Sequence, residues 1–207
     1  MVGVGKPCSE ACERNKHPIL DALRSLLGES GFLLEIGSGT GQHAVHCGTA
    51  LPRWTWQTSD LPQNHAGIQL WIAESRLPNV LPPVLLDVAQ EPWPIDRADA
   101  VFSANTAHIM GWTQVQAMFR GIGRILGRNG VFCLYGPFRR GGVHTSASNE
   151  RFDVALRRED PRMGVRDLEA LEDLAQGNGL VLTDDIAMPA NNRMLVWRPG
   201  SSARSRV

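Results

Sequence analysis

Residues 32–44 read FLLEIGSGTGQHA, and this stretch decides the fold. A short apolar run leads into three alternating glycines, Gly37, Gly39 and Gly41, and the residues after Gly41 can continue as a helix. Glycines let the backbone turn tightly and let a ligand approach it closely. The free N–H groups at the start of a helix suit a polar or anionic ligand. The stretch therefore predicts a buried parallel strand, a glycine turn and a helix that together hold a nucleotide-like cofactor.

The spacing of these glycines distinguishes between two classes of cofactor. The dinucleotide fingerprint G-x-G-x-x-G needs a glycine at position 42, where this chain has Gln42. The observed pattern, E-x-G-x-G-x-G from Glu35 to Gly41, resembles the first motif of class I S-adenosylmethionine (SAM) methyltransferases. A plain glycine turn without a ligand is the simpler alternative. A nicotinamide-dependent oxidoreductase and a non-catalytic SAM-binding partner protein stay open as other functions.

Length and charge restrict the class of protein. The 207 residues, 43% of them hydrophobic, suit one α/β domain with a sizeable core. The 21 basic and 21 acidic residues cancel, so no global positive field is available to gather nucleic acid. No apolar run approaches the roughly 18 residues that span a bilayer, and the N-terminus lacks a signal-peptide core. We expect a cytoplasmic protein that binds neither nucleic acid nor membrane, with its oligomeric state open.

The four cysteines, Cys8, Cys12, Cys47 and Cys133, are too few and too scattered for a disulfide framework. Cys8 and Cys12 could share a helix face, but no further ligands stand at a spacing typical of a metal site. We therefore expect free thiols and no metal.

Hydrophobic periodicity divides the rest of the chain into alternating strands and helices. Pro18 is expected to bend or restart the first helix, and 127–130 reads as a turn. The polar segment 136–149 is too long for a simple crossover and is predicted to be an anion-binding lid, with a mobile surface loop as the alternative. The predicted helices are 9–27, 64–75, 112–126, 152–158 and 167–176, and the further strands are 54–59, 82–86, 98–104, 131–135, 180–186 and 194–197.

Two acidic residues at predicted strand ends extend the cofactor site. Asp60 lies 19 residues after Gly41, about where a carboxylate meets both ribose hydroxyls of a nucleotide. Asp87 ends the next strand and can accept a hydrogen bond from the adenine amino group, while Val88 offers a backbone N–H and an apolar wall. A helix cap for Asp60 and a loop acid for Asp87 are the alternatives.

The acceptor side of the site is predicted around His108, which follows the strand at 98–104. Ligands of open α/β sheets sit outside the carboxyl ends of the strands, so His108 is the first candidate for a base and His144 the second. An anionic acceptor would instead be held by arginines, with Asn149, Asn191 and Asn192 closing the far side. The arginines are Arg139, Arg140 and Arg166. A purely structural role is the alternative for His108.

Several motifs together resemble one family. Glu13-Arg14-Asn15, LEIGSGTGQHA, Asn105 with His108, Tyr135-Gly136-Pro137, Ser148-Asn149 with Phe152-Asp153, Arg166-Asp167 and MPANN at 188–192 recur over residues 9–198. The set resembles the uncharacterised SAM-dependent methyltransferase family that includes methyltransferase-like protein 26, known as DUF938 or UPF0585. This resemblance implies a Rossmann-like class I fold with seven strands, six parallel and one antiparallel, and helices on both faces. It implies no substrate.

The motifs and their neighbours enlarge both predicted sites. The cofactor set gains Arg14, Asn15, Glu35, Ser38, His43, Leu61 and Asn105, and the substrate set gains Tyr135. We expect an N-terminal helical segment over 1–30 that covers the cofactor site, a methyltransferase domain over 31–199 with a substrate-side loop at 137–150, and a disordered tail over 200–207. The expected reaction is methyl transfer from SAM to a small molecule, acidic in one reading, with O-methylation favoured over N- or S-methylation.

Overall fold

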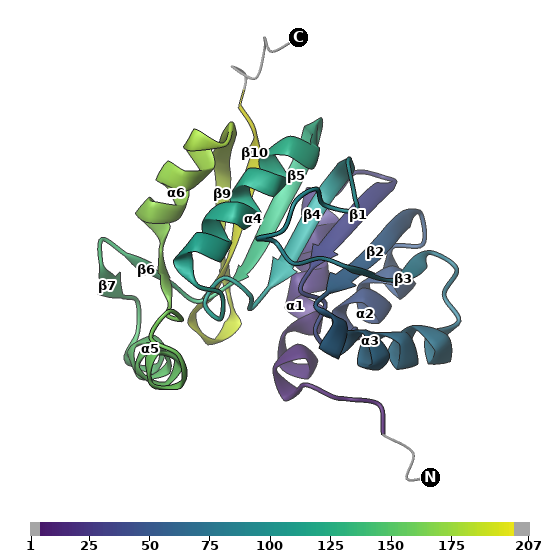
Figure 1. The fold of residues 1–207 in the computed structure, drawn as a ribbon, viewed down its shortest axis with the longest axis horizontal. Helices are drawn as coiled ribbons and strands as arrows, with labels where there is room; N and C mark the ends of the chain where they lie inside the picture. The colour runs from purple at the N-terminus through teal and green to yellow at the C-terminus, as the bar shows by residue number, and fades with distance from the viewer. Residues whose placement is uncertain (1–4, 201–207) are drawn as a thin grey trace.

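A seven-stranded sheet forms the centre of the molecule (Figure 1). The structure is a computed structural model that describes residues 5–200, so the predicted tail lies outside the described residues apart from Gly200. The strands follow the order β3-β2-β1-β4-β5-β10-β9. They are β1 (Gly31–Ile36), β2 (Trp54–Asp60), β3 (Val80–Leu85), β4 (Ala98–Ala104), β5 (Leu126–Gly136), β9 (Leu180–Met188) and β10 (Asn192–Pro199).

The strand order reverses at β1, which pairs in parallel with both β2 and β4. Chain crossovers leave β1 in opposite directions here, so a crevice opens beyond the carboxyl ends of β1 and β4. β10 is antiparallel to both of its neighbours, β5 and β9. The predicted arrangement, a mostly parallel sheet with one antiparallel strand, is therefore confirmed, and it places the glycine turn after β1 at the reversal point.

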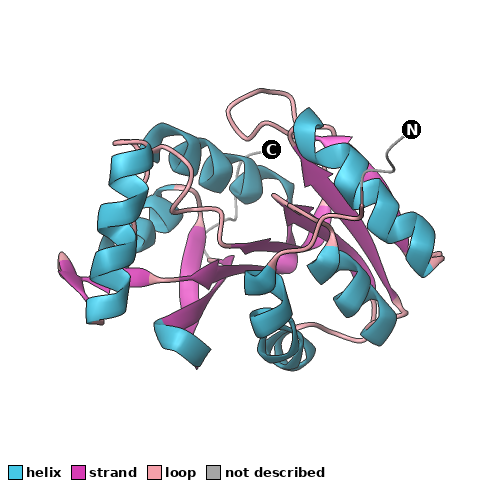
Figure 2. Ribbon diagram, turned by 90° about the horizontal axis from the view of Figure 1, so that it is seen from below, coloured by secondary structure: helices cyan, strands magenta, loops and turns pink. Residues whose placement is uncertain are grey.

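Helices cover both faces of the sheet (Figure 2). Helices α1 (Glu10–Leu26), α2 (Gln42–Ala50) and α3 (Pro62–Ser75) lie on one face, and α4 (Trp112–Ile125) and α6 (Leu168–Gly177) lie on the other. Side chains of a strand alternate between faces, so Cys133 and Tyr135 of β5 point toward α1 while Phe132 and Leu134 point toward α4. This alternation decides that the Tyr135 side chain belongs to the α1 side.

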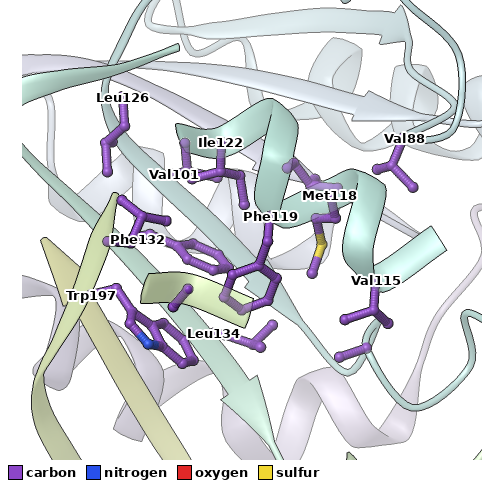
Figure 3. Close-up of a cluster of buried hydrophobic side chains, with 14 of the residues drawn as sticks. Val88, Val101, Val115, Met118, Phe119, Ile122, Leu126, Phe132, Leu134 and Trp197 are labelled. Carbon is purple, nitrogen blue, oxygen red and sulfur yellow. The ribbon is translucent and has the colours of Figure 1, made fainter. Parts of the chain in front are cut away.

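Three aromatic rings form the middle of the α4 side of the core (Figure 3). Phe119 of α4 packs edge-to-face on Phe132 and on Trp197, with ring centroids 5.4 and 5.3 Å apart. Phe132 and Trp197, from the adjacent strands β5 and β10, stack at 5.2 Å. All three side chains are fully buried, and these contacts join the antiparallel strand to the parallel part of the sheet.

The structure corrects two of the predicted elements on the basis of how the helices and strands run. α1 runs from Glu10 to Leu26 without restarting at Pro18, and Asn15 and Ile19 on either side of the proline are both buried. The predicted turn at 127–130 lies within β5, which already pairs at Leu126 with Ala98. The four residues are accommodated as an irregularity opposite Asp99, between two regular stretches of pairing.

The segment 136–149 has regular secondary structure over most of its length, and its predicted role as an anion-binding lid stays a prediction. Strands β6 (Phe138–Arg140) and β7 (Val143–His144) form an antiparallel hairpin, and β6 also pairs in parallel with β8 (Arg166–Asp167). Helix α5 (Ala147–Glu159) follows the hairpin, so this helix begins five residues before the predicted 152. These three short strands form a second sheet beside the main one (Figure 1).

Substitution of two helical glycines would test how α4 and α6 pack. A methyl group at Gly121 of α4 would overlap the indole ring of Trp93, whereas one at Gly177 of α6 would meet nothing within 4 Å. We expect Gly121→Ala to lower the free energy of unfolding by about 1–3 kcal/mol through overpacking. Gly177→Ala should leave it unchanged or raise it by up to about 1 kcal/mol. Chemical denaturation measures both, and equal effects of the two variants would contradict the packing of Trp93 on α4.

Candidate functional site

The glycine loop after β1 is tied to the end of β2 by backbone hydrogen bonds. The N–H groups of Gly37 and Ser38 both donate to the carbonyl of Ser59, at 3.1 and 2.9 Å, and Ser59 N–H donates to Ser38 Oγ at 3.1 Å. The Gly39 N–H donates to Asp60 Oδ2 at 2.7 Å. Gly37 and Gly39 have φ of 72° and 58°, the left-handed region that favours glycine. The loop therefore keeps one shape, with an open space over Gly39.

A cavity of about 370 Å³ lies beside this loop at the reversal point of the strand order, and we refer to it as the glycine-loop cavity. It contains seven of the residues predicted to bind the cofactor, which are Gly37, Gly39, Asp60, Leu61, Asp87, Val88 and Asn105. Its remaining lining comes from Ile36, Gln63, Asn64, Leu86, Ala104, Thr106, Ile109, Met110 and Gln114. The glycine turn, both strand-end acids and the end of β4 thus meet around one space.

The Asp60 carboxylate has room for about one more hydrogen bond. Oδ2 accepts from Gly39 N–H, and Oδ1 accepts from Leu61 N–H at 2.7 Å and from Asn64 Nδ2 at 2.9 Å. A carboxylate offers about four lone-pair sites, so one site on Oδ2 stays available on the cavity side. The predicted contact with two hydroxyls at once would need the Asn64 amide to move away.

Six of the predicted cofactor residues do not line the glycine-loop cavity: Arg14 and Asn15 line a second cavity, described below, and Glu35, Ser38, Gly41 and His43 line neither. Glu35 lies under the loop, where Oε2 accepts a hydrogen bond from Trp56 Nε1 at 3.0 Å. Its side chain is almost completely buried, and this burial raises the pKa of the carboxyl from 4.5 to about 7. Burial disfavours the charged form of a carboxyl. Glu35 is therefore a buried group beside the loop and not part of the cavity lining.

The first turn of α1 is held against the loop by Gln42, a residue that sequence reasoning used only to reject a dinucleotide. Gln42 Oε1 accepts hydrogen bonds from Ser9 N–H at 2.6 Å and from Thr40 Oγ1 at 2.8 Å. Gln42 Nε2 donates to Glu13 Oε1 at 2.5 Å. Gln42, which stands where the dinucleotide fingerprint has its third glycine, therefore fastens the N-terminal helix to the glycine loop.

A second cavity of about 440 Å³ lies between α1 and the tip of the β9–β10 pair, and we refer to it as the Tyr135 cavity. Asn105 lines both cavities, so the two spaces meet at the end of β4. Asn105 has a φ of 59°, and its N–H donates to the carbonyl of Tyr135 at 2.9 Å. The cavity is lined by Ala11, Arg14, Asn15, Asn105, Tyr135, Pro189, Ala190 and Asn192, which unites predicted cofactor and substrate residues.

A chain of buried polar groups runs from α2 to the Tyr135 cavity. His43 Nε2 lies 2.8 Å from Asn15 Oδ1, and His43 Nδ1 lies 3.8 Å from the thiol of Cys12. Burial lowers the pKa of His43 to about 4. Burial also raises the pKa of the Tyr135 phenol, although hydrogen bonds from the Asn15 and Asn192 amides lower it. Cys12 carries no sequence motif, so only the fold could reveal its place here.

His108 lies at the predicted end of β4, but it lines neither of these two cavities. Its ring packs edge-to-face on Phe152 of α5, with centroids 5.0 Å apart, and its carbonyl accepts from Gly164 N–H at 2.9 Å. Burial, with a smaller contribution from the charge of Arg166, lowers the pKa of His108 to about 4. The ring is therefore neutral at pH 7, and its assignment as a base stays a prediction.

Arg140, Arg166 and His144 are engaged in contacts within the protein, whereas the buried Nε of Arg139 has no hydrogen-bond partner among the described residues. Arg140 forms an ion pair with Asp185, and the Arg166 guanidinium donates to the backbone carbonyls of Ala107, Met110 and Arg162. His144 Nε2 lies 3.5 Å from Asp153 Oδ2. Arg140 and Arg166, two of the arginines predicted to hold an anion, thus join the small sheet to neighbouring parts of the protein. Neither cavity is lined by Arg139, Arg140, His144 or Arg166.

Of the predicted substrate-binding asparagines, Asn192 lines the Tyr135 cavity, whereas Asn149 and Asn191 do not. Asn149 is buried, and its Nδ2 donates to Thr145 Oγ1 and to the carbonyl of Asn191, each at 3.1 Å. These bonds fasten α5 to the turn between β9 and β10, where Ala190 and Asn191 have φ of 58°. Asn192 is the member of the predicted pair that lines the Tyr135 cavity. The predicted acceptor site between His108, the 136–149 segment and the paired amides therefore stays a prediction, and of these residues Asn192 alone lines the Tyr135 cavity.

Residues 5–200 lack two features that would suggest other functions. No helix in this range combines the length and apolarity that crossing a bilayer would require. Within the same range, no group of three or more histidine, cysteine or acidic side chains is placed to hold a metal ion. All four cysteines are free thiols.

A family model described as "Protein of unknown function (DUF938)" matches residues 6–199. Solved structures similar to the chain include a mitomycin 7-O-methyltransferase, with a TM-score of 0.78 and 14% identity over 92% of this chain and 54% of that one. An O-methyltransferase family protein from Burkholderia thailandensis has a TM-score of 0.78 and 14% identity, over 93% of this chain and 58% of that one.

An O-methyltransferase from neocarzinostatin biosynthesis, solved with SAM and 2-hydroxy-5-methyl naphthoic acid, has a TM-score of 0.74 and 16% identity. The match covers 91% of this chain and 54% of that one. The chain thus spans a little more than half the length of these three solved structures. These likenesses establish the fold, which is the predicted Rossmann-like class I methyltransferase fold.

The raised pKa of Glu35 predicts how stability depends on pH. A carboxyl with a folded-state pKa above its unfolded value contributes stability below about pH 4.5 that is lost as the pH rises through about 7. A glutamine side chain at this position does not titrate and can still accept from Trp56. We expect Glu35→Gln to gain stability relative to wild type over this window, by roughly 3–4 kcal/mol at pH 8, since one pKa unit is about 1.4 kcal/mol.

The measurement is chemical denaturation of both proteins at a series of pH values. The difference between variant and wild type isolates Glu35 from the buried histidines, which titrate equally in both. A difference that stays constant from pH 4.5 to 8 would show that Glu35 is ionised in the folded protein at neutral pH.

Proposed function

The chain belongs to the DUF938 family, and we propose that it is a SAM-dependent methyltransferase that acts on a small molecule. The observation that carries the proposal is the glycine-loop cavity, where an E-x-G-x-G-x-G loop and two strand-end acids surround one space at the reversal point of the sheet. The similar O-methyltransferases, of which one was solved with SAM, support it. Within the family, the chain is proposed to group with methyltransferase-like protein 26.

The residues of the glycine-loop cavity fit SAM as the cofactor. A side-chain carbon at Gly39 would meet no atom within 4 Å, so a ligand has room to approach the backbone there. Asp60 has a free lone-pair site for a ribose hydroxyl, and Asp87 with the buried Val88 would hold the adenine. SAM supplies an activated methyl group and its own leaving group. The chain therefore mainly has to position two molecules, which can contribute roughly 7–11 kcal/mol.

The Tyr135 cavity is the proposed acceptor site. It adjoins the glycine-loop cavity at Asn105, and it is closed by α1 on one side and by the β9–β10 turn on the other. Its volume, about 440 Å³, suits a small molecule rather than a macromolecule. We favour an oxygen as the methylated atom. Residues 1–30 are proposed to cover the site and 31–199 to form the methyltransferase domain, since Gln42 ties the first turn of α1 to the glycine loop.

Two other functions make different predictions. A nicotinamide-dependent oxidoreductase would bind a dinucleotide, which is disfavoured by Gln42 in place of the third glycine and by its contacts with α1. A non-catalytic SAM-binding protein would need only the first cavity. The presence of a second cavity beside the first favours an enzyme over that alternative.

Cofactor binding can be tested with two glycines that share a backbone conformation. Gly39 and Gly141 have φ of 58° and 55°, and a side-chain carbon at either meets nothing within 4 Å. Only Gly39 lines the glycine-loop cavity, because Gly141 lies in the turn of the β6–β7 hairpin. We expect Gly39→Arg to abolish binding of SAM and of S-adenosylhomocysteine, and Gly141→Arg to retain it.

Isothermal titration with SAM, S-adenosylhomocysteine and NAD, each alone, gives the comparison. Equal binding of S-adenosylhomocysteine by the two arginine variants would sink the assignment of the cavity. Binding of NAD in preference to SAM by the wild type would favour the oxidoreductase.

The role of Asp60 predicts a loss of affinity for SAM. Asp60→Asn removes the charge from hydrogen bonds to the ribose and to Gly39, and a hydrogen bond to a charged group contributes about 1.5–3 kcal/mol. We expect SAM affinity to fall by about tenfold or more while the cooperative thermal transition is kept. Titration calorimetry and a melting curve measure the two properties. Unchanged affinity would mean that the carboxylate only shapes the loop.

A further inference from the structure

Another cavity, of about 320 Å³, lies at the opposite edge of the sheet from the glycine-loop cavity, and we refer to it as the arginine cavity. The glycine-loop cavity is lined by residues where parallel strands end, such as Ile36 of β1 and Ala104 of β4. The arginine cavity is lined by residues where they begin, such as Trp54 of β2 and Asp99 of β4. β10 runs antiparallel to β5 and ends at the same edge (Figure 1). The six residues of β1 rise about 3.3 Å each, so roughly 20 Å separates the two edges and the cavities are distinct sites.

An irregularity in β5 accompanies this cavity. The pairing of β5 with β4 is interrupted between two regular stretches, so residues 127–130 face Asp99 alone. Extra residues on one strand disrupt the ladder locally and bend that strand. All of 127–130 line the cavity, and Arg128 and Asn129 among them are exposed. The cavity therefore lies where the pairing of the two strands is interrupted.

Three guanidinium groups from separate elements border the cavity. Arg97 precedes β4, Arg128 lies in the interrupted part of β5, and Arg198 lies in β10. No ion pair between described residues includes any of the three. Arg198 Nη2 donates to the carbonyl of Leu26, the last residue of α1, at 3.3 Å. Since each guanidinium has five N–H donors, most of the donors around the cavity are available to a ligand.

The charges that line the cavity do not balance. Asp99 is the acidic residue of the lining, and its Oδ2 accepts a hydrogen bond from Phe32 N–H at 2.9 Å. Two further acids, Glu29 and Asp96, are adjacent in sequence to lining residues but do not line the cavity. One carboxylate therefore faces three guanidinium groups, which leaves two positive charges in excess. Like charges held together repel one another, and a ligand with two negative charges would remove the imbalance.

We propose that the arginine cavity binds the phosphate group of a small phosphate monoester, at a site separate from that of the proposed methyl transfer. Such a phosphate carries close to two negative charges at pH 7 and offers three acceptor oxygens. The paired N–H donors of a guanidinium match the geometry of phosphate oxygens. A carboxylate brings a single charge and would leave the lining positive.

The size of the cavity and its apolar lining indicate an organic phosphate rather than the free ion. The volume, about 320 Å³, falls within the roughly 300–1,000 Å³ of small-molecule sites. Leu26, Trp54 and Val131 contribute apolar surface to the lining. Trp54 Nε1 donates to the carbonyl of Gly28 at 2.9 Å, which fixes the indole ring. These side chains therefore provide a wall for the organic part of the ligand.

Two probes of nearly the same shape test the charge requirement. Phenyl phosphate carries close to two negative charges at pH 8, because the second pKa of a phosphate monoester is about 6, whereas benzenesulfonate carries one. Inorganic phosphate is the third probe. Isothermal titration of the full-length protein at constant ionic strength gives the dissociation constants, since salt screens such interactions. We expect phenyl phosphate to bind about tenfold more tightly than either of the other probes.

Two arginines of the cavity can be changed beside a matched control. Arg97 and Arg128 are exposed, and so is Arg151 of α5, which does not line the cavity and also has no ion pair with a described residue. Glutamine removes the charge and keeps a hydrogen-bond donor. We expect Arg97→Gln combined with Arg128→Gln to weaken binding of phenyl phosphate by about tenfold or more. Arg151→Gln should leave it within about twofold of wild type, and melting curves check that both proteins fold.

The indole N–H of Trp54 locates the bound probe. The six tryptophans of the chain give six indole signals in a ¹⁵N spectrum, and Trp54→Phe identifies the signal of Trp54. We expect this signal to shift during titration of the wild type with phenyl phosphate, with the dissociation constant that calorimetry gives. At the same concentration of probe, the shift should be smaller in the double arginine variant.

Several results would overturn the inference. Equal affinity for phenyl phosphate and benzenesulfonate would show that two charges are not required. Equal losses in the double arginine variant and in Arg151→Gln, or a Trp54 signal that does not move while phenyl phosphate binds, would place the ligand elsewhere. Inorganic phosphate that binds as tightly as phenyl phosphate would show that the free ion is the ligand. Failure of all three probes to bind at millimolar concentration would show that the arginines are only solvated.

Discussion

The hydrogen bond from Gly39 N–H to the Asp60 carboxylate is the constraint on which the site depends. It joins the turn after β1 to the end of β2, and its geometry requires a left-handed residue at 39 and an acid at the neighbouring strand end. The paired bonds to the Ser59 carbonyl hold the same turn one residue earlier. With the loop fixed in this way, the space over Gly39 stays open, and the reversal of strand order places it beside the end of β4.

The N-terminal helix turns this open crevice into two adjoining cavities. Gln42 fastens the first turn of α1 to the loop, and Asn15, further along α1, lines one cavity together with Tyr135 of β5. His43 lies between them on α2, so one buried network couples the helix, the loop and the wall of the second cavity. A chemical change at His43 is therefore expected to be felt in the Tyr135 cavity, which Asn15 lines.

Local patterns predicted the parts of the site that follow from strand ends. The glycine loop, Asp60, Asp87 and the position of Asn105 are set by where a parallel strand stops, and parallel strands stop at one edge of the sheet. The same rule placed His108 at that edge correctly but said nothing about the direction of its side chain. Packing against Phe152 turned the ring toward α5, and backbone carbonyls took the Arg166 guanidinium.

The sequence by itself determined the class of sheet, the glycine turn and the acids around it, because these depend on hydrophobic period, glycine spacing and adjacent strand ends. Only the tertiary structure decided that 136–149 is a hairpin of a second sheet, and that the second cavity lies between α1 and the β9–β10 turn. The physical reason is that these outcomes rest on contacts between residues far apart in the chain. The bond from Asn15 to His43 and the one from Asn149 to Asn191 leave no periodic or spacing signal in the sequence.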